Sequence, residues 1–124
     1  MATRALASYR KGDNLYHIDL TLLFWKDNGT HYVYAPALDL TGYGKTEVEA
    51  KKSFETTLGM FADYSITKGT IYKELERLGW TTNKKKKRVK APTDEELMED
   101  NEALRELASR PGVLRQESSV ALAL

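Results

Sequence analysis

Apolar and polar side chains alternate over residues 15–25, where every second residue from Tyr16 to Phe24 is apolar. This period of two is typical of a strand that buries one face. Turn-forming residues follow at 26–29, and Asn28-Gly29 supplies the positive φ angles that a tight hairpin needs. Residues 30–35, rich in β-branched and aromatic side chains, are therefore expected to return antiparallel to the first strand.

The next segment predicts a short strand and then a helix. Pro36 ends regular pairing because it has no N–H, so residues 37–40 are expected to form a third strand before the turn Gly42-Tyr43-Gly44. We interpret these glycines as giving backbone freedom at a strand-to-helix turn. Thr46 and Glu49 form a capping box, and the apolar spacing behind it predicts a helix over residues 47–67.

The second half of the chain is expected to alternate short elements. Apolar spacing predicts a short helix that starts at Ile71 and stops at Gly79, and residues 80–82 are typical of a returning strand. A second capping box predicts a helix over residues 94–109. The tail, residues 113–124, is either a last strand or a disordered tail; a strand there would pair with an edge of its own sheet or of a second subunit's.

Composition and charge exclude several classes of protein. The 124 residues, 41% apolar and 30% charged, are the usual size and make-up of one folded domain, and the net charge of +1 gives no long-range field. Cysteine is absent, which removes disulfides and the commonest zinc sites and agrees with a cytoplasmic location. No apolar run approaches the roughly 20 residues that span a bilayer, so no membrane segment is expected.

A search for chemistry finds no complete site. His17 and His31 lie on strands expected to face each other, with Asp19 as the one plausible further group, but a metal or acid–base site needs more ligands at defined geometry. Asp19 and Asp39 are too scattered for a two-metal site. No serine elbow, HExxH pair or phosphate loop occurs. We therefore predict that the protein is not an enzyme and has no catalytic residue, metal or cofactor.

Charged runs in the second half leave alternatives open. One basic run is either a nucleic-acid contact or a solvated edge strand protected by its charge; its residues are Lys84, Lys85, Lys86, Lys87 and Arg88. The helix expected at 94–109 is acidic, and its carboxylates either pair with the basic run, face solvent or dock on a basic partner. Tyr43, between two glycines, is expected to be exposed in a loop.

One segment carries a family resemblance. Residues 31–50, HYVYAPALDLTGYGKTEVEA, combine a strand ending in proline, an acidic residue, a glycine-containing turn and a T-x-x-E-A helix start. This pattern resembles the HicB antitoxin family, and the resemblance continues through Leu78-Gly79-Trp80, a little over half of the chain.

The resemblance implies an α+β, partial ribonuclease-H-like fold, with an antiparallel βββαβ sheet and helices on one face. To this fold the sequence adds a C-terminal helix and a possible final strand. The expected division is a core at residues 1–90 and an extension at 91–124.

The implied function is the antitoxin of a type II toxin–antitoxin pair, which binds a small basic HicA-like mRNA interferase. The expected partner-binding residues are Asp39, Tyr43, Glu95 and Glu99. A homodimer or higher homo-oligomer is expected as well. After Trp80 the chain departs from the DNA-binding layouts of the family, which leaves the lysine run as the candidate DNA contact.

Overall fold

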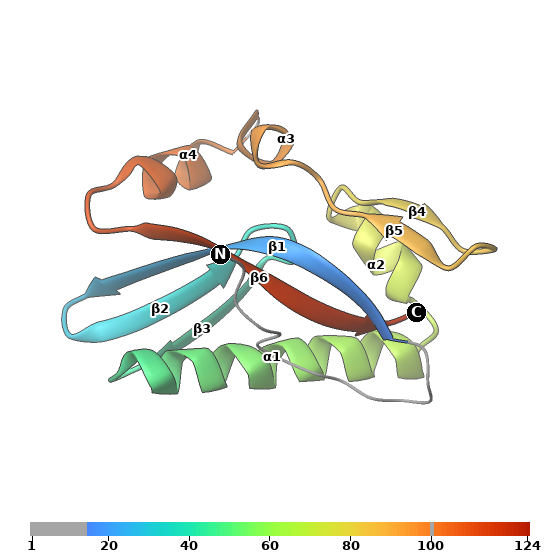
Figure 1. Ribbon diagram of the computed structural model, residues 1–124, viewed down its shortest axis with the longest axis horizontal. Coiled ribbons are helices and arrows are strands. Elements are labelled where there is room, and N and C mark those ends of the chain that lie inside the picture. The colour runs from blue at the N-terminus through green and yellow to red at the C-terminus, as the bar shows by residue number, and fades with distance from the viewer. Residues whose placement is uncertain (1–14, 100) are drawn as a thin grey trace.

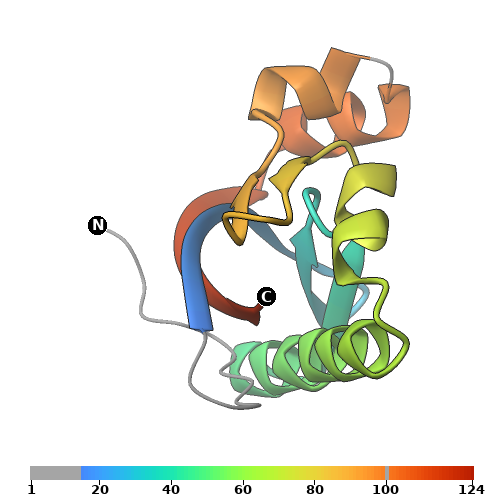
Figure 2. The same ribbon diagram turned by 90° about the vertical axis from the view of Figure 1, so that its right-hand side faces the viewer.

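The computed structural model describes residues 15–99 and 101–124. Four of its strands form one antiparallel sheet in the order β3-β2-β1-β6, and two more form a separate hairpin. Helix α1 lies on one face of the sheet, and α3 and α4 lie on the other (Figure 1). Figure 2 shows the same three layers from the side. The elements are β1 (Leu15–Asp27), β2 (Thr30–Ala35), β3 (Leu40–Gly44), α1 (Glu47–Thr67), α2 (Ile71–Arg77), β4 (Thr81–Asn83), β5 (Arg88–Lys90), α3 (Asp94–Glu99), α4 (Glu102–Ser109) and β6 (Leu114–Ala123).

The first hairpin confirms its sequence signals. β2 has the predicted bounds, and β1 runs two residues further than predicted, to Asp27. Asn28 and Gly29 have φ angles of 49° and 78°, as a tight hairpin turn requires. The register, from Asp27 opposite Thr30 to Leu23 opposite Tyr34, sends alternate side chains to the two faces of the sheet.

The third strand lies further along the chain than predicted. Residues 36–39 form a turn, in which Leu38 N donates to Ala35 O over 3.2 Å, and the strand then runs through Gly42. A Cβ atom on Gly42 would lie 2.3 Å from Phe54 N, because α1 crosses the strand at this point. The interpretation of Gly42 and Gly44 as turn residues is therefore wrong: they permit close helix–strand contact.

Helix α1 has the predicted bounds and cap. Thr46 Oγ1 accepts from Glu49 N over 3.1 Å. The Glu49 carboxylate accepts from Lys45 N over 2.9 Å, whereas a regular capping box would use the N–H of Thr46. The buried stripe of α1 includes Ala50, Phe54 and Leu58, which belong to one core with the strand residues Leu22, Val33, Ala35, Val120 and Leu122.

The fourth strand of the sheet is β6, so the expectation that residues 80–82 complete it is wrong. β6 pairs antiparallel with β1 over ten residue pairs, whereas β4 has three residues and pairs with β5. The longer ladder satisfies more backbone groups and buries Val120 and Leu122, which explains why the tail occupies this place. Although β6 lies beyond the expected division at residue 90, it belongs to the same sheet as β1.

Two further expectations are corrected beyond β5. The helix expected over residues 94–109 is broken into α3 and α4, since Asn101 caps α4 by accepting from Leu104 N over 3.0 Å. Helices also cover both faces of the sheet rather than one (Figure 2). Among the described residues no helix is long and apolar enough to cross a membrane.

Candidate functional site

A row of aromatic side chains crosses the sheet face opposite α1. The strand registers place Trp25 opposite Tyr32 and Tyr32 opposite Tyr43, so the three side chains share this face. The rings of Trp25 and Tyr32 are stacked, with centroids 5.1 Å apart and planes 14° apart. Tyr43 is 65% exposed, which confirms its predicted exposure, although it lies on a strand and not in a loop. The row therefore presents aromatic surface out to the sheet edge.

Tyr34 and Asp39 form a polar pair beside this row. The Tyr34 hydroxyl donates to Asp39 Oδ1 over 2.9 Å, and the exposed Asp39 has a φ of 52°, in the left-handed region. Burial, followed by the hydrogen bond and the charge of Asp39, raises the pKa of Tyr34 to about 12. The phenol is therefore protonated at neutral pH and fixes the position of the Asp39 carboxylate.

An apolar groove lies between the aromatic face and α4. Its volume is about 350 Å³. Leu104 is buried and attaches α4 to the sheet, and Leu107 is half-buried at the groove. The lining comes from β1, β2, β3 and from α4 with its N-cap: Trp25, Tyr32, Tyr34, Thr41, Asn101, Ala103, Leu104 and Leu107. Aromatic rings thus face aliphatic side chains across an open slot.

The acidic residues of α3 divide into two kinds. Asp94 attaches the helix to the sheet: its Oδ2 atom accepts from Thr21 Oγ1 over 3.2 Å and lies 3.6 Å from Arg115 Nη1. Glu95 and Glu99 are exposed, and no ion pair of theirs occurs in the described part of the chain. These two carboxylates are therefore available to a cationic partner, in line with one alternative that the sequence leaves open.

The four predicted partner-binding residues do not form one cluster. Tyr43 and Asp39 belong to the β2–β3 side of the molecule, while Glu95 and Glu99 lie on α3. Within residues 15–99 and 101–124, no hydrogen bond or ion pair joins the two sets. Sequence reasoning missed Trp25, Tyr32 and the leucines of α4, although the aromatic alternation of β1 and β2 was a usable signal.

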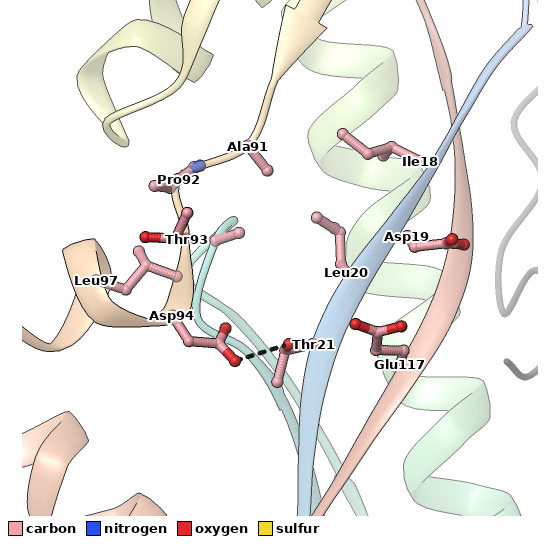
Figure 3. A pocket seen from close by; sticks show the side chains of 11 residues that line it. Ile18, Asp19, Leu20, Thr21, Ala91, Pro92, Thr93, Asp94, Leu97 and Glu117 are labelled. Atoms are coloured by element: carbon pink, nitrogen blue, oxygen red, sulfur yellow. Dashed lines mark hydrogen bonds between the residues drawn. The ribbon is translucent and has the colours of Figure 1, made fainter. Parts of the chain in front are cut away.

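A second hollow, also about 350 Å³, lies between β1, β6 and the chain before α3 (Figure 3). Asp19 and Glu117 line it, and Asp94 reaches across to Thr21. Asp39 lies elsewhere, bonded to Tyr34, so Asp19 and Asp39 are not neighbours in one site. No group of three residues able to hold a metal ion occurs among the described residues.

The two histidines are not neighbours, so their expected proximity across the hairpin is wrong. His31 stands opposite Lys26 and Gly44, whereas His17 stands opposite Ala121 on β6. The long β1 strand separates His17 from the hairpin end, and a joint acid–base or metal role of the pair is therefore excluded by geometry.

The basic run occupies the tip of the β4–β5 hairpin. Lys84, Lys85, Lys86 and Lys87 form the turn, so the expectation that they lie on an edge strand is wrong, and only Arg88 begins a strand. Lys86 N donates to Asn83 Oδ1 and Lys87 N to Lys84 O, both over 3.2 Å, which orders the turn. These five cations are exposed and take part in no ion pair within the described residues.

The basic hairpin and the acidic helices do not neutralise each other as a whole. In Figure 1 the hairpin tip points away from both helices: α3 lies between the hairpin and α4, and α4 lies on the far side of the molecule from the tip. Lys90 of β5 does act on one acidic residue, Glu96. The pKa of Glu96 is below its usual value, mainly because of its hydrogen bonds with Thr93 and to a smaller degree because of the charge of Lys90. The lysines of the tip therefore remain available to an anionic partner.

Comparisons of the chain with protein-family models, with curated proteins and with solved structures find no match.

Proposed function

We propose that this protein is the antitoxin of a HicAB-type type II toxin–antitoxin pair. It would bind a small, basic HicA-like mRNA interferase in the cytoplasm and block its active surface, without catalysis or a cofactor of its own. The observation that carries the proposal is the architecture: three consecutive antiparallel strands, the long helix α1, and a last strand that pairs with β1. The first three strands and α1 follow the order that the resemblance of residues 31–50 implies, whereas the fourth strand of the sheet comes from the C-terminal tail and not from residues 80–82.

The surface of the molecule supports a role in binding proteins. An open aromatic and aliphatic groove lies beside the acidic helices α3 and α4. Tyrosine and tryptophan contribute much of the energy of protein interfaces because they bury large areas at a low cost in side-chain entropy. Exposed carboxylates nearby complement a basic partner and accelerate its association.

Co-expression with the product of the adjacent gene tests this proposal. That product alone should arrest growth, and the present protein should restore growth and co-purify with it as a stable complex. A double variant, Tyr43→Ala with Glu99→Gln, should weaken both effects, while Met60→Ala with Glu55→Gln on the exposed side of α1 serves as the matched control. Persistent arrest despite soluble, folded protein, with no complex on gel filtration, would refute the antitoxin role.

The homo-oligomer expected from the sequence is part of the same proposal. β6 pairs with β1 of its own chain, so a second subunit would have to use another surface or one of the two sheet edges, β3 or β6. Light scattering during gel filtration, over a range of concentrations, should give twice the monomer mass or more. A monomer mass at every concentration would reject this part alone.

A nucleic-acid-binding module is a second candidate function, favoured by the ordered and unpaired cations of the β4–β5 hairpin tip. Changing Lys84, Lys85, Lys86 and Lys87 to alanine should weaken duplex DNA binding. A plot of the logarithm of the binding constant against the logarithm of the salt concentration should also become less steep. Its slope should decrease by about 0.9 for each phosphate that is no longer neutralised. The matched control removes four exposed lysines elsewhere, Lys45, Lys52, Lys68 and Lys73. Equal effects in both variants, or no binding by the unaltered protein at low salt, would reject this candidate.

A further inference from the structure

The helical layer above the aromatic face covers only part of the sheet. α4 packs on the β1 side, where Leu104 and Leu23 line one narrow gap of about 10 Å³. The groove begins where this contact ends, and Tyr32 and Tyr34 of β2 and Thr41 of β3 line it on the sheet side. On the opposite face, α1 covers β3 so closely that glycine is required at position 42. Among the described residues, no helix closes the groove on the β2 and β3 side of α4.

The hydrogen bonds that a bound segment needs for its backbone determine whether a strand or a helix fits the groove. The backbone groups of β2 are already used in ladders with β1 and β3, so an added segment finds no main-chain partners on the sheet face. A strand would need such partners, whereas a helix satisfies its own backbone. An amphipathic helix placed beside α4 would bury its apolar stripe on Tyr32, Tyr34 and Leu107.

The charges around the groove determine the polar side of that helix. On α3 and α4, Asp94 is occupied by Thr21 and Arg115, and Glu106 lies 3.7 Å from Arg110. Arg105 donates to main-chain carbonyls of Met98 and Glu99 rather than to a carboxylate. Four exposed carboxylates remain without an ion pair among the described residues: Glu95, Glu96, Glu99 and Glu102. Of these, Glu96 accepts a hydrogen bond from Thr93 N over 3.0 Å in its capping box.

We propose that this groove binds a basic amphipathic helix of the partner protein. The apolar side of the helix packs on the Trp25–Tyr32 stack and Leu107, and its lysine or arginine side chains lie next to Glu99 and Glu102. The inference rests on the proposed protein-binding function and identifies the site and the kind of element bound there. It commits to a partner helix and not to a second copy, because the elements that border the groove are themselves acidic.

Two tryptophans allow a direct test by NMR. Trp25 lines the groove, whereas Trp80 is buried and donates its indole N–H to Ala37 O over 2.7 Å, so its signal is an internal control. A designed amphipathic helix of leucine and lysine should shift the Trp25 indole signal in a saturable titration and leave Trp80 unchanged. A leucine–glutamate helix of the same pattern, or the leucine–lysine residues in scrambled order, should not. An unmoved Trp25 signal, or equal binding of both charge types, would overturn the proposal.

Variants separate the apolar and charged contributions. Ala103→Trp places a large side chain into the groove from an exposed position on α4 and should abolish peptide binding while the protein stays folded. Glu99→Gln with Glu102→Gln should weaken binding about fivefold, as expected for two exposed charge pairs. The matched control is Glu47→Gln with Glu55→Gln on α1, which also neutralises two exposed carboxylates, one of them in the first turn of a helix, and should change binding less than about twofold.

The same variants distinguish failure of this inference from failure of the antitoxin proposal. If the product of the adjacent gene binds equally well to Ala103→Trp, the groove proposal is overturned and the antitoxin proposal stands. If that product does not bind at all but the leucine–lysine helix occupies the groove, the antitoxin proposal fails and the groove proposal stands. A shift of the Trp25 signal with protein concentration alone would show a second copy in the groove, which overturns the choice of occupant.

Discussion

The two faces of the central sheet are covered in different ways. On one face α1 lies directly against β3, with Phe54 and Leu58 buried and no room for a side chain at Gly42. On the other face α3 and α4 are short, Leu104 is the one buried side chain of α4, and an open groove remains between α4 and β2. Close packing of this kind contributes most of the stability of a small domain.

This difference separates stability from recognition. Burial on the α1 face supplies apolar contacts that fix the sheet, so the opposite face can leave Trp25, Tyr32 and Tyr43 partly or largely exposed. Exposed aromatic surface costs solubility and is typical of interaction sites. We therefore expect substitutions on the α1 face to change the free energy of unfolding, and substitutions on the α4 face to change mainly binding.

The largest expected effect is that of Phe54→Ala. Phe54 is fully buried between α1 and the sheet, so its truncation should lower the free energy of unfolding by about 4 kcal/mol. Leu107→Ala, at the half-buried groove wall, should cost about 1 kcal/mol or less. Urea denaturation followed by circular dichroism measures both. Equal decreases would mean that the two faces are packed alike and would remove the basis of the comparison.

Gly42→Ala should have the next largest effect. The added methyl group would approach main-chain atoms of α1 to 2.3 Å, which forces the helix away from β3 and should cost about 3 kcal/mol. Gly59→Ala is the matched control in α1 itself, since nothing lies within 4 Å of its added Cβ, and it should stabilise the protein by about 1 kcal/mol. A neutral Gly42→Ala would show that α1 can shift, contrary to the close contact described.

The elements of the α1 face were predictable because their signals are local. Alternation in β1, the Asn28-Gly29 turn and the capping box at Thr46 each lie within a few residues, and the bounds of β2 and α1 match the prediction. The position of β3 was missed because the requirement for Gly42 comes from Phe54, twelve residues away in the sequence. The place of β6 depends on pairing with β1, about a hundred residues earlier, which no local pattern contains.

The candidate site was predictable only in part for the same reason. Exposure of Tyr43 followed from its local context, whereas the availability of Glu95 and Glu99 was one of the alternatives that the sequence left open. The groove could not be predicted, because it forms only when α4 lies over Tyr32 and Trp25. The position of α4 depends on the helix break at Asn101, where the sequence pattern predicts one continuous helix. A periodic pattern within one segment predicts which side chains share a face of that segment, but not which side chains from distant segments contact each other.

Asn101→Ala should reveal how independently α4 unfolds. Removal of the cap to Leu104 N should cost about 1 kcal/mol. Because α4 has few buried side chains, we expect this substitution to speed amide hydrogen exchange in α4 while the urea midpoint of the whole protein barely moves. Thr46→Ala, which removes the corresponding cap of α1, should instead lower the global midpoint. A lower midpoint in both variants would show that α4 unfolds together with the sheet.

The smallest expected effect is the pH dependence from Tyr34. Its pKa is about 12 in the folded protein, against 10.0 for the ordinary side chain. Between these values the folded protein keeps a proton that the unfolded chain has released, so stability is retained below pH 10 and falls as the pH rises toward 12. The side chain is partly exposed, so the decrease should stay below about 1 kcal/mol. Tyr34→Phe should remove this part of the decline in urea titrations at alkaline pH. Asp39→Asn should keep a part of the decline, because burial is the largest single cause of the shift. If Asp39→Asn removed the decline as fully as Tyr34→Phe does, the Asp39 carboxylate and not burial would control the pKa of the phenol.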